Sequence, residues 1–382
     1  MRQIIFISII FLSTQALSEN TSTGTNALLN NTTGSKNVAV GDSAMKSNTS
    51  GLNNTAVGYF GLRNNTTGKQ NTAVGSYSLR YNTTGDDNTA VGFESLKYNT
   101  TGDKNTAVGN YALQDNTSGT SNTSIGNYAL SDNTVGDKNT AVGNYSMRSN
   151  SSGNDNTSMG NYAMRDNTSG SDNTANGNYA LRNNTSGSNN TALGNQSMKA
   201  NTTGGSNTAI GDDAQLNNTT GSYNVSVGNA ALSSANGDTN TAIGYRAAYT
   251  NTAGSGNVMI GHKAGYNEAG SDKLYISNSD TASPLIYGDF ATQEVTINGN
   301  LIINTLKDSS GNSMIRTVGN VVHIGKNSVT LEDASTTSSG KDEIASSNND
   351  LQIGTSTSHS TTIKGTLSVQ APTSANHATT KT

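Results

Sequence analysis

The sequence contains no cysteine and no tryptophan, and only two prolines among its 382 residues. Without cysteine the chain has no disulfide framework, no thiol nucleophile and no thiolate metal ligand. Hydrophobic residues make up 31% of the chain and aromatic residues 5%, which is well below the apolar share of an ordinary globular domain. The composition therefore argues against a conventional hydrophobic core of this size.

Charge is also scarce. Charged residues make up 13% of the chain and the net charge is −4, so the electrostatic swelling typical of many disordered chains is absent. The mildly acidic balance argues against nucleic acid as a partner. Four histidines, His262, His323, His359 and His377, lie too far apart to suggest a ligand set or a Ser/His/Asp arrangement. We expect no enzymatic activity, no cofactor and no structural metal, and the sequence identifies no specific ligand-binding residues.

The N-terminus has the pattern of a secretory signal peptide. Arg2 precedes an almost unbroken apolar run over 4–12, and Ala16 and Ser18 form a small-x-small cleavage site. A membrane anchor is the alternative, but the run is much shorter than the roughly 20 residues that span a bilayer. We therefore expect a secreted or cell-surface protein with no membrane span after cleavage.

Asparagine recurs with a constant step of 17 residues, the sign of a repeat architecture. The step extends backwards to Asn20, slips by one residue at Asn240 and resumes at Asn257. Because Asn20 follows the predicted cleavage site closely, the mature chain would begin near a repeat boundary. The unbroken run comprises Asn37, Asn54, Asn71, Asn88, Asn105, Asn122, Asn139, Asn156, Asn173, Asn190, Asn207 and Asn224.

The consensus of one repeat is NTAVGNYALRNNTTGxx, whose positions we number 1 to 17 from this asparagine. Glycine at positions 5 and 15 indicates two places where the backbone turns or approaches a neighbour closely. By period-two alternation Thr55 and Val57 share one face, while Ala56 and Gly58 share the other. The pattern predicts two short strands and two turns per repeat, which form one coil of a β-solenoid. A helical repeat is disfavoured because helical repeats have periods above about 30 residues.

One valine and one leucine or methionine per coil would give a thin interior. We therefore expect homo-oligomerisation, in which the small Ala and Gly side chains permit close approach of another chain. The abundant Asn and Thr are expected to form side-chain ladders between identical positions of successive coils. At about 4.8 Å per coil, fifteen coils would form a rod about 70 Å long.

Two surface columns follow from the repeat. The basic column at position 10 could dock anionic polysaccharide or lipid headgroups, or be a solvated edge partly neutralised by acids such as Asp86, Asp103, Asp115, Asp132 and Asp166. The tyrosine column at position 7 could stack sugar rings if exposed, or be a packing ladder, which we favour. Position 10 carries Lys46, Arg63, Arg80, Lys97, Gln114, Ser131, Arg148, Arg165, Arg182 and Lys199. Position 7 carries Tyr111, Tyr128, Tyr145, Tyr162 and Tyr179.

The Asn-Thr-Ala-Val-Gly unit at 54–58 and its copies resemble the Ser-Val-Ala-Ile-Gly coils in the head of trimeric autotransporter adhesins, whose repeat is shorter. Similar long repeats occur in phage-tail-fibre-like surface proteins. The segment 258–299 is similar to the end of such arrays. The segment 371–381 resembles a tail-fibre sequence motif that leads into a coiled coil or a receptor-binding tip. The resemblance implies a homotrimeric, left-handed parallel β-roll that extends or displays an adhesive surface.

These patterns divide the chain into four parts. We predict a signal peptide over 1–18, a β-roll repeat array forming a head or stalk over 19–272, and a closing β-hairpin region over 273–305. C-terminal β elements and a linker follow over 306–382.

Within the C-terminal third, strand-like alternation occurs in three segments, separated in part by a Ser/Asp/Lys-rich linker over 333–349. The three segments are 295–303, 321–331 and 362–369.

The predicted fold class is all-β: a β-solenoid of 17-residue coils followed by short β elements. The predicted function is a non-enzymatic, secreted or surface-displayed fibrous adhesin that presents a binding surface to cells or glycans. The alternative is an ice-binding solenoid with a threonine file formed by Thr55, Thr72, Thr89 and Thr106, although the second outward file would be apolar. A solenoid enzyme such as a polysaccharide lyase is disfavoured because no repeat gathers acids, His or Arg.

Overall fold

The computed structural model describes residues 19–301, 305–307, 313–318 and 321–324. The predicted signal peptide and the predicted elements over 333–349 and 362–369 lie outside these residues. Every regular element in the described part of the chain is a β-strand, so the all-β fold class is confirmed. The same part contains no helix that is long and apolar enough to cross a lipid bilayer.

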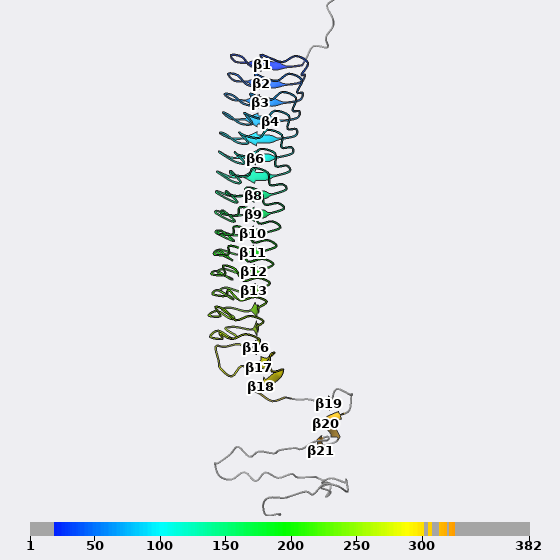
Figure 1. Ribbon diagram of the computed structural model, residues 1–382, viewed down its shortest axis with the longest axis vertical. Coiled ribbons are helices and arrows are strands. Elements are labelled where there is room, and N and C mark those ends of the chain that lie inside the picture. The colour runs from blue at the N-terminus through cyan, green and yellow to red at the C-terminus, as the bar shows by residue number, and fades with distance from the viewer. Residues whose placement is uncertain (1–18, 302–304, 308–312, 319–320, 325–382) are drawn as a thin grey trace, which may run out of the picture. The chain divides into compact units, whose positions relative to one another are not determined.

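Fifteen three-residue strands stack in parallel, one from each coil, and lie above one another along one side of a solenoid (Figure 1). Identical positions face each other in neighbouring strands, as Thr55 faces Thr72 and Val57 faces Val74. The strands are β1 (Thr21–Thr23), β2 (Val38–Val40), β3 (Thr55–Val57), β4 (Thr72–Val74), β5 (Thr89–Val91), β6 (Thr106–Val108), β7 (Thr123–Ile125), β8 (Thr140–Val142), β9 (Thr157–Met159), β10 (Thr174–Asn176), β11 (Thr191–Leu193), β12 (Thr208–Ile210), β13 (Val225–Val227), β14 (Thr241–Ile243) and β15 (Val258–Ile260).

The one-residue slip in the repeat leaves this register intact. Val225 of β13 faces Thr241 of β14, although the two are only 16 residues apart. The main-chain N–H of Asn240 still donates to Oδ1 of Asn224, as in the regular coils. The missing residue is therefore absorbed in the turns of that coil and not in its strand.

Each coil has one strand, so the prediction of two strands per coil is wrong. The segment expected to be the second strand is a series of turns with residues of positive φ, such as Tyr111 at 58° and Leu113 at 51°. Their N–H groups point alternately to the two neighbouring coils, since Tyr111 donates to the carbonyl of Phe93 and Leu113 to that of Ala129. Backbone pairing between coils therefore continues outside the strands.

The glycine at position 5 is required by both conformation and space. Gly109 has a φ of 136°, a conformation that residues with a side chain rarely adopt. A Cβ atom there would also overlap the carbonyl oxygen of Gly126 in the next coil. Coils can stack at strand spacing only because this position has no side chain.

The interior of the solenoid is closed within one chain. Ala107 at position 3 and Leu113 at position 9 are fully buried, whereas Val108 at position 4 points outward and is 37% exposed. The expectation that the alanine face approaches another chain is therefore wrong, because these alanines line the interior of their own coil. The buried large residues of this interior are Met45, Leu62, Leu79, Leu96, Leu113, Leu130, Met147, Met164, Leu181, Met198, Leu232 and Met259.

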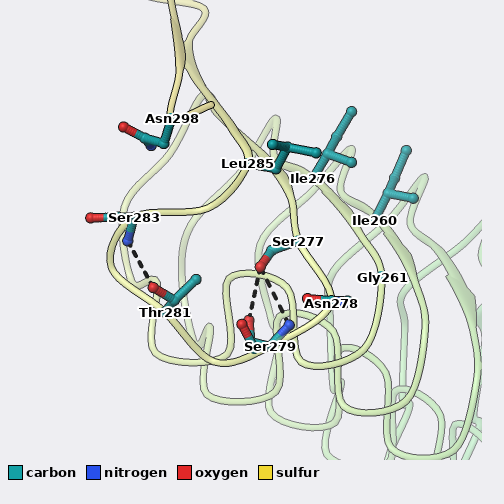
Figure 2. A pocket seen from close by; sticks show the side chains of 10 residues that line it. All are labelled: Ile260, Gly261, Ile276, Ser277, Asn278, Ser279, Thr281, Ser283, Leu285 and Asn298. Atoms are coloured by element: carbon teal, nitrogen blue, oxygen red, sulfur yellow. Dashed lines mark hydrogen bonds between the residues drawn. The ribbon is translucent and has the colours of Figure 1, made fainter. Parts of the chain in front are cut away.

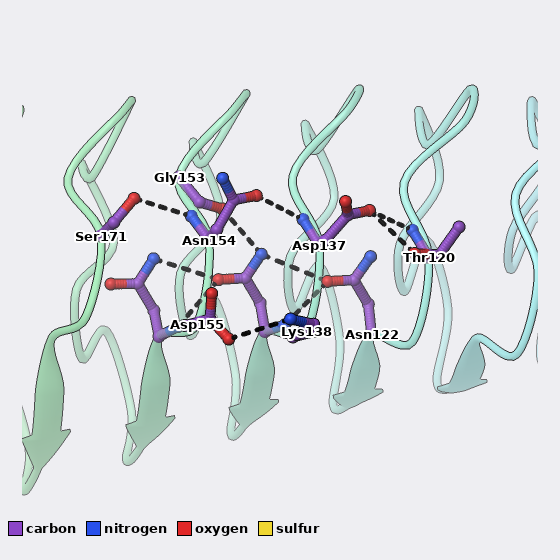
Figure 3. Close-up of polar contacts among 10 residues, drawn as sticks. Thr120, Asn122, Asp137, Lys138, Gly153, Asn154, Asp155 and Ser171 are labelled. Atoms are coloured by element: carbon purple, nitrogen blue, oxygen red, sulfur yellow. Dashed lines mark hydrogen bonds and ion pairs between the residues drawn. The ribbon is translucent and has the colours of Figure 1, made fainter.

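The expected asparagine ladder runs through the interior at position 1. Asn105 is fully buried, and its Nδ2 donates to Oδ1 of Asn88 at 3.1 Å and to the carbonyl of Gly119 at 2.8 Å. Its Oδ1 accepts from the main-chain N–H of Asn122 at 3.0 Å and from the side-chain amide of Asn122 at 3.2 Å. Figure 3 shows this arrangement at Asn122 and the next coils. Buried polar groups are thus paired with the coils on both sides.

A second asparagine ladder occupies position 12 and is interrupted at Gln215 and again at Ala235, which takes the place of asparagine in the coil that contains β13. In the regular coils the amide of Asn116 donates to Oδ1 of Asn99 at 2.7 Å. Gln215 replaces leucine at position 9 of its coil and is fully buried. Its Oε1 accepts from the amide of Asn218 at 3.4 Å, and Oδ1 of Asn201 is left without a partner in the described part of the chain. Gln215 therefore separates the hydrophobic core into two clusters and breaks the polar ladder.

Three longer strands follow the coils. β16 (Lys273–Ile276) pairs with β15 in parallel, and β17 (Ile286–Asp289) and β18 (Glu294–Ile297) then add in antiparallel order. These strands end the parallel stack and lie at its C-terminal end in Figure 1. β18 overlaps the predicted strand segment 295–303 and begins one residue before it; 302–303 lies outside the described residues.

The residues from 301 onward form a separate unit. It contains the antiparallel sheet of β19 (Thr305–Lys307), β20 (Ser313–Val318) and β21 (Val321–Ile324). β21 begins the predicted segment 321–331, whose remaining residues lie outside the described part. Short β elements after the solenoid are thus confirmed.

Candidate binding surfaces

The outward face of the parallel sheet is apolar and uncharged. Position 2 is mostly threonine and is half-buried, while position 4 is mostly valine or isoleucine and is exposed or nearly so. Val57 is 38% exposed and Ile125 is 41% exposed. We name this surface the Thr/Val face. A file of apolar side chains on an exposed sheet face, interrupted in β10 by Asn176, is an unusual surface to leave in water.

The basic column at position 10 is neutralised unevenly. Lys97 pairs with Glu94 at 3.0 Å, and Arg165 pairs with Asp166 at 2.6 Å. Arg148 lies 3.8 Å from Asp132. Lys46, Arg63, Arg80, Arg182 and Lys199 form no ion pair within the described residues.

Asp86 and Asp103, two acids expected to neutralise this column, have another role. Oδ1 of Asp86 accepts from the main-chain N–H of Lys69, and Oδ1 of Asp103 accepts from that of Asp86, both at 2.7 Å. Asp, Asn or Ser at position 16 repeats this contact in other coils. Figure 3 shows the row formed by Thr120, Asp137, Asn154 and Ser171. This acceptor row fixes the turns of successive coils to one another.

Aromatic rings pack against the cations in the N-terminal coils. The guanidinium carbon of Arg63 lies 4.6 Å from the ring centre of Phe60, and that of Arg80 lies 4.7 Å from the ring centre of Tyr81. Arg80 also contacts Phe60 and Tyr77, each at 5.3 Å. Attraction between cations and aromatic rings holds these guanidinium groups against the surface.

The tyrosine column is a stacked ladder, as we favoured. The rings of Tyr145 and Tyr162 are 5.2 Å apart with an interplanar angle of 5°, and Tyr162 and Tyr179 are 5.3 Å apart at 1°. Each ring is half-buried, and its faces are turned toward the rings of neighbouring coils. Because the ring faces inside the ladder are covered, sugar stacking on them is excluded there.

Two carboxyls near the columns have perturbed pKa values. Burial raises the pKa of Asp115, and the negative charge of Asp132 raises it further, against a smaller opposite effect of Lys97. Burial likewise raises the pKa of Asp213, with a further contribution from Asp212. Both carboxyls gain protons more readily in the folded chain.

A pocket of about 640 Å³ lies at the C-terminal end of the Thr/Val face. Figure 2 shows Ile260, Ile276 and Leu285 on one side and a hydroxyl-bearing loop on the other. In that loop Ser277 Oγ donates to the carbonyl of Ser279 at 3.1 Å. The pocket continues the apolar file at its C-terminal end.

The described residues contain no group of three or more His, Asp or Glu side chains that could hold a metal ion. No protein-family model, curated protein or solved structure matched the chain. The resemblance to adhesin heads and tail fibres thus rests on the sequence motifs, and the solenoid architecture itself is what the structure supports.

Several surface features were not predicted from the sequence. The pair Glu94 and Lys97 has the three-residue spacing that could have indicated it. Phe60, Tyr77 and Tyr81 were not linked to the basic column, because residues with positive φ change the direction of successive side chains in a way that strand alternation does not describe. The pocket depends on the path of the loop after β16, for which the repeat gives no information.

Proposed function

We propose that the protein is a non-enzymatic, secreted or surface-displayed fibre whose solenoids associate as a homotrimer through the Thr/Val face. The observation that carries this proposal is the uncharged file along the sheet, which is mostly valine and isoleucine, is interrupted by Asn176 and has no partner within the described residues. Identical copies can approach along such a face without charge repulsion. The basic column belongs to the turn segment after the strand and is the surface proposed to meet cells or glycans.

The magnitude of the burial supports an association that needs many coils. Covering the exposed third of one valine contributes about 0.5–1 kcal/mol per coil. Association costs about 4–15 kcal/mol, so a few coils are not sufficient, whereas the whole array contributes roughly 10 kcal/mol per chain. The association therefore requires that apolar side chains recur at position 4 in most coils of the array.

Light scattering after size-exclusion chromatography tests the oligomeric state of the chain expressed without its predicted signal peptide. We expect three times the chain mass, and expect the double variant Val91→Asp, Val108→Asp to dissociate at the same concentration. The double variant Asn127→Asp, Asn144→Asp places the same two charges on exposed turns of adjacent coils and is the matched control, which should remain trimeric. A folded monomer of the unsubstituted chain contradicts the trimer. An intact trimer that binds neither cells nor glycans contradicts the adhesin function.

Ice binding is the second candidate, and the Thr file on an exposed flat sheet is the observation that favours it. Thr55, Thr72 and Thr89 repeat at strand spacing on the same face as the valines. An ice-binding face has to be open to solvent, whereas the trimer covers it. Thermal hysteresis from a folded monomer would favour ice binding, and its absence from a monomer would exclude it.

A further inference from the structure

We propose that Lys46, Arg63 and Arg80 form a binding site for a linear anionic polysaccharide that lies along the rod. This inference rests on the proposed function, in which the turn segments meet external ligands, and it names the ligand class. The three residues occupy position 10 of three successive coils, which places their charges about 5 Å apart in a row.

The three side chains form the longest run of unneutralised cations in the column. None of them forms an ion pair within the described residues. Beyond them Lys97 is neutralised by Glu94, and the next two coils carry Gln114 and Ser131. A polyanion aligned with the rod would therefore find three adjacent partners here and an interrupted row further on.

The arginines are also partly removed from water without receiving an acceptor. The Nε atoms of Arg63 and Arg80 are buried and have no hydrogen-bond partner among the residues that the structure describes. Their guanidinium carbons lie 4.6 Å from the ring centre of Phe60 and 4.7 Å from that of Tyr81. A cation that is held in place and has already lost part of its hydration gains more from an incoming anion than a mobile, fully hydrated one.

The geometry favours polysaccharide over nucleic acid. Single-stranded nucleic acid is bound by stacking its bases on free aromatic faces. Here the Phe60 ring stacks on Tyr59 at 3.9 Å and is covered by Arg63, and Tyr81 stacks on Tyr98 at 5.3 Å and is covered by Arg80. A polysaccharide with regularly spaced sulfate or carboxylate groups needs only the row of cations.

Binding of the secreted chain to immobilised heparin and to polygalacturonate, measured at several salt concentrations, tests the site. We expect the double variant Arg63→Gln, Arg80→Gln to lose about tenfold in affinity and to depend less steeply on salt. The matched control Arg148→Gln, Arg165→Gln removes the same charge from arginines that already face Asp132 and Asp166. It should lose less than about threefold.

Two further variants distinguish a loss of binding caused by the missing charges from a loss caused by misfolding. Arg63→Lys, Arg80→Lys keeps both charges and should bind heparin within about threefold of the original chain. Lys46→Gln lies outside the aromatic contacts and should weaken binding about threefold, with an unchanged melting temperature.

Equal losses in the two Gln double variants, binding that does not depend on salt, or equally tight binding of oligothymidylate would overturn the inference. Anionic lipid vesicles that compete as well as heparin would do the same. A folded monomer that binds heparin through Arg63 and Arg80 refutes the trimer and leaves this site standing. A trimer that binds cells without these arginines refutes the site alone.

Discussion

Replacing one interior asparagine should weaken the solenoid as much as removing a large hydrophobic side chain does in an ordinary core. Asn105→Ala removes four hydrogen bonds that join its coil to the coils before and after it and to its own turn. The substitution leaves the strand, the glycines and the apolar interior unchanged. It therefore isolates the contribution of the polar ladder.

The expected loss follows from what each partner retains. The side-chain amide of Asn122 keeps the carbonyl of Gly136, and the carbonyl of Gly119 keeps the amide of Asn116. Only the main-chain N–H of Asn122 loses its acceptor completely, which costs about 1–3 kcal/mol for a buried donor. The other three bonds contribute about 0.5–1.5 kcal/mol each. We expect the free energy of unfolding to fall by about 4 kcal/mol.

Denaturant unfolding followed by circular dichroism, at a fixed protein concentration, measures this loss. Amide hydrogen exchange should show the largest loss of protection in the coils that contain Asn105 and Asn122, because coils contact only their neighbours. The control Asn127→Ala removes an exposed asparagine without a side-chain hydrogen bond within the described residues and should change stability by less than about 0.5 kcal/mol. A loss below about 1 kcal/mol for Asn105→Ala, or equal losses for both variants, would refute the reasoning.

Three further predictions concern one or two residues each. Gly109→Ala should prevent stacking of its coil on the next one, because the new Cβ meets the carbonyl of Gly126 at a φ of 136°, and should lower the melting temperature more than Asn127→Ala. Gln215 Nε2 donates to the Thr208 carbonyl and to Ser226 Oγ, so the double variant Gln215→Leu, Ser226→Ala restores the side chains of the regular coils. It should raise stability by about 1–2 kcal/mol in denaturant unfolding, since it joins the two core clusters and frees the amide of Asn218 for Asn201; a loss of stability would contradict this. Asp115→Asn should stabilise the fold at pH 7 by a few tenths of a kcal/mol and have no effect near pH 3. The pKa of Asp115 is raised in the folded chain, so the charged carboxylate lowers stability once the pH has risen through the folded-state pKa. At pH 3 the carboxyl is protonated and this effect is absent. Equal effects of the substitution at both pH values would contradict the raised pKa.

The repeat predicts the solenoid and its ladders because both follow from periodicity. Equal spacing places Asn88, Asn105 and Asn122 above one another, and strand alternation places Ala107 and Val108 on opposite faces. The sequence does not reveal which face lies inside, because alanine next to valine makes the valine face the obvious interior. It also gives no sign that Tyr111 and Leu113 adopt positive φ, since bulky side chains are not typical of that conformation.

For the surface, the sequence predicts which residues form columns but not which contacts their side chains make. Which cations are neutralised depends on side-chain directions in the turns, and these follow from the left-handed residues. Asp86 and Asp166 have the same charge and lie near the same column in sequence, yet the first accepts a main-chain N–H and the second pairs with Arg165.

The junction between β13 and β14 has a consequence for how such a chain can change over time. There a coil with one residue fewer joins its neighbours through the same asparagine contact and the same strand pairing as all the others. Because strand pairing and the position 1 asparagine contact are shared by these junctions, deleting or duplicating a whole regular coil by unequal recombination would rejoin two surfaces that already fit. Gene-level changes in repeat number would then alter the length of the rod in steps of about 5 Å without requiring a new core.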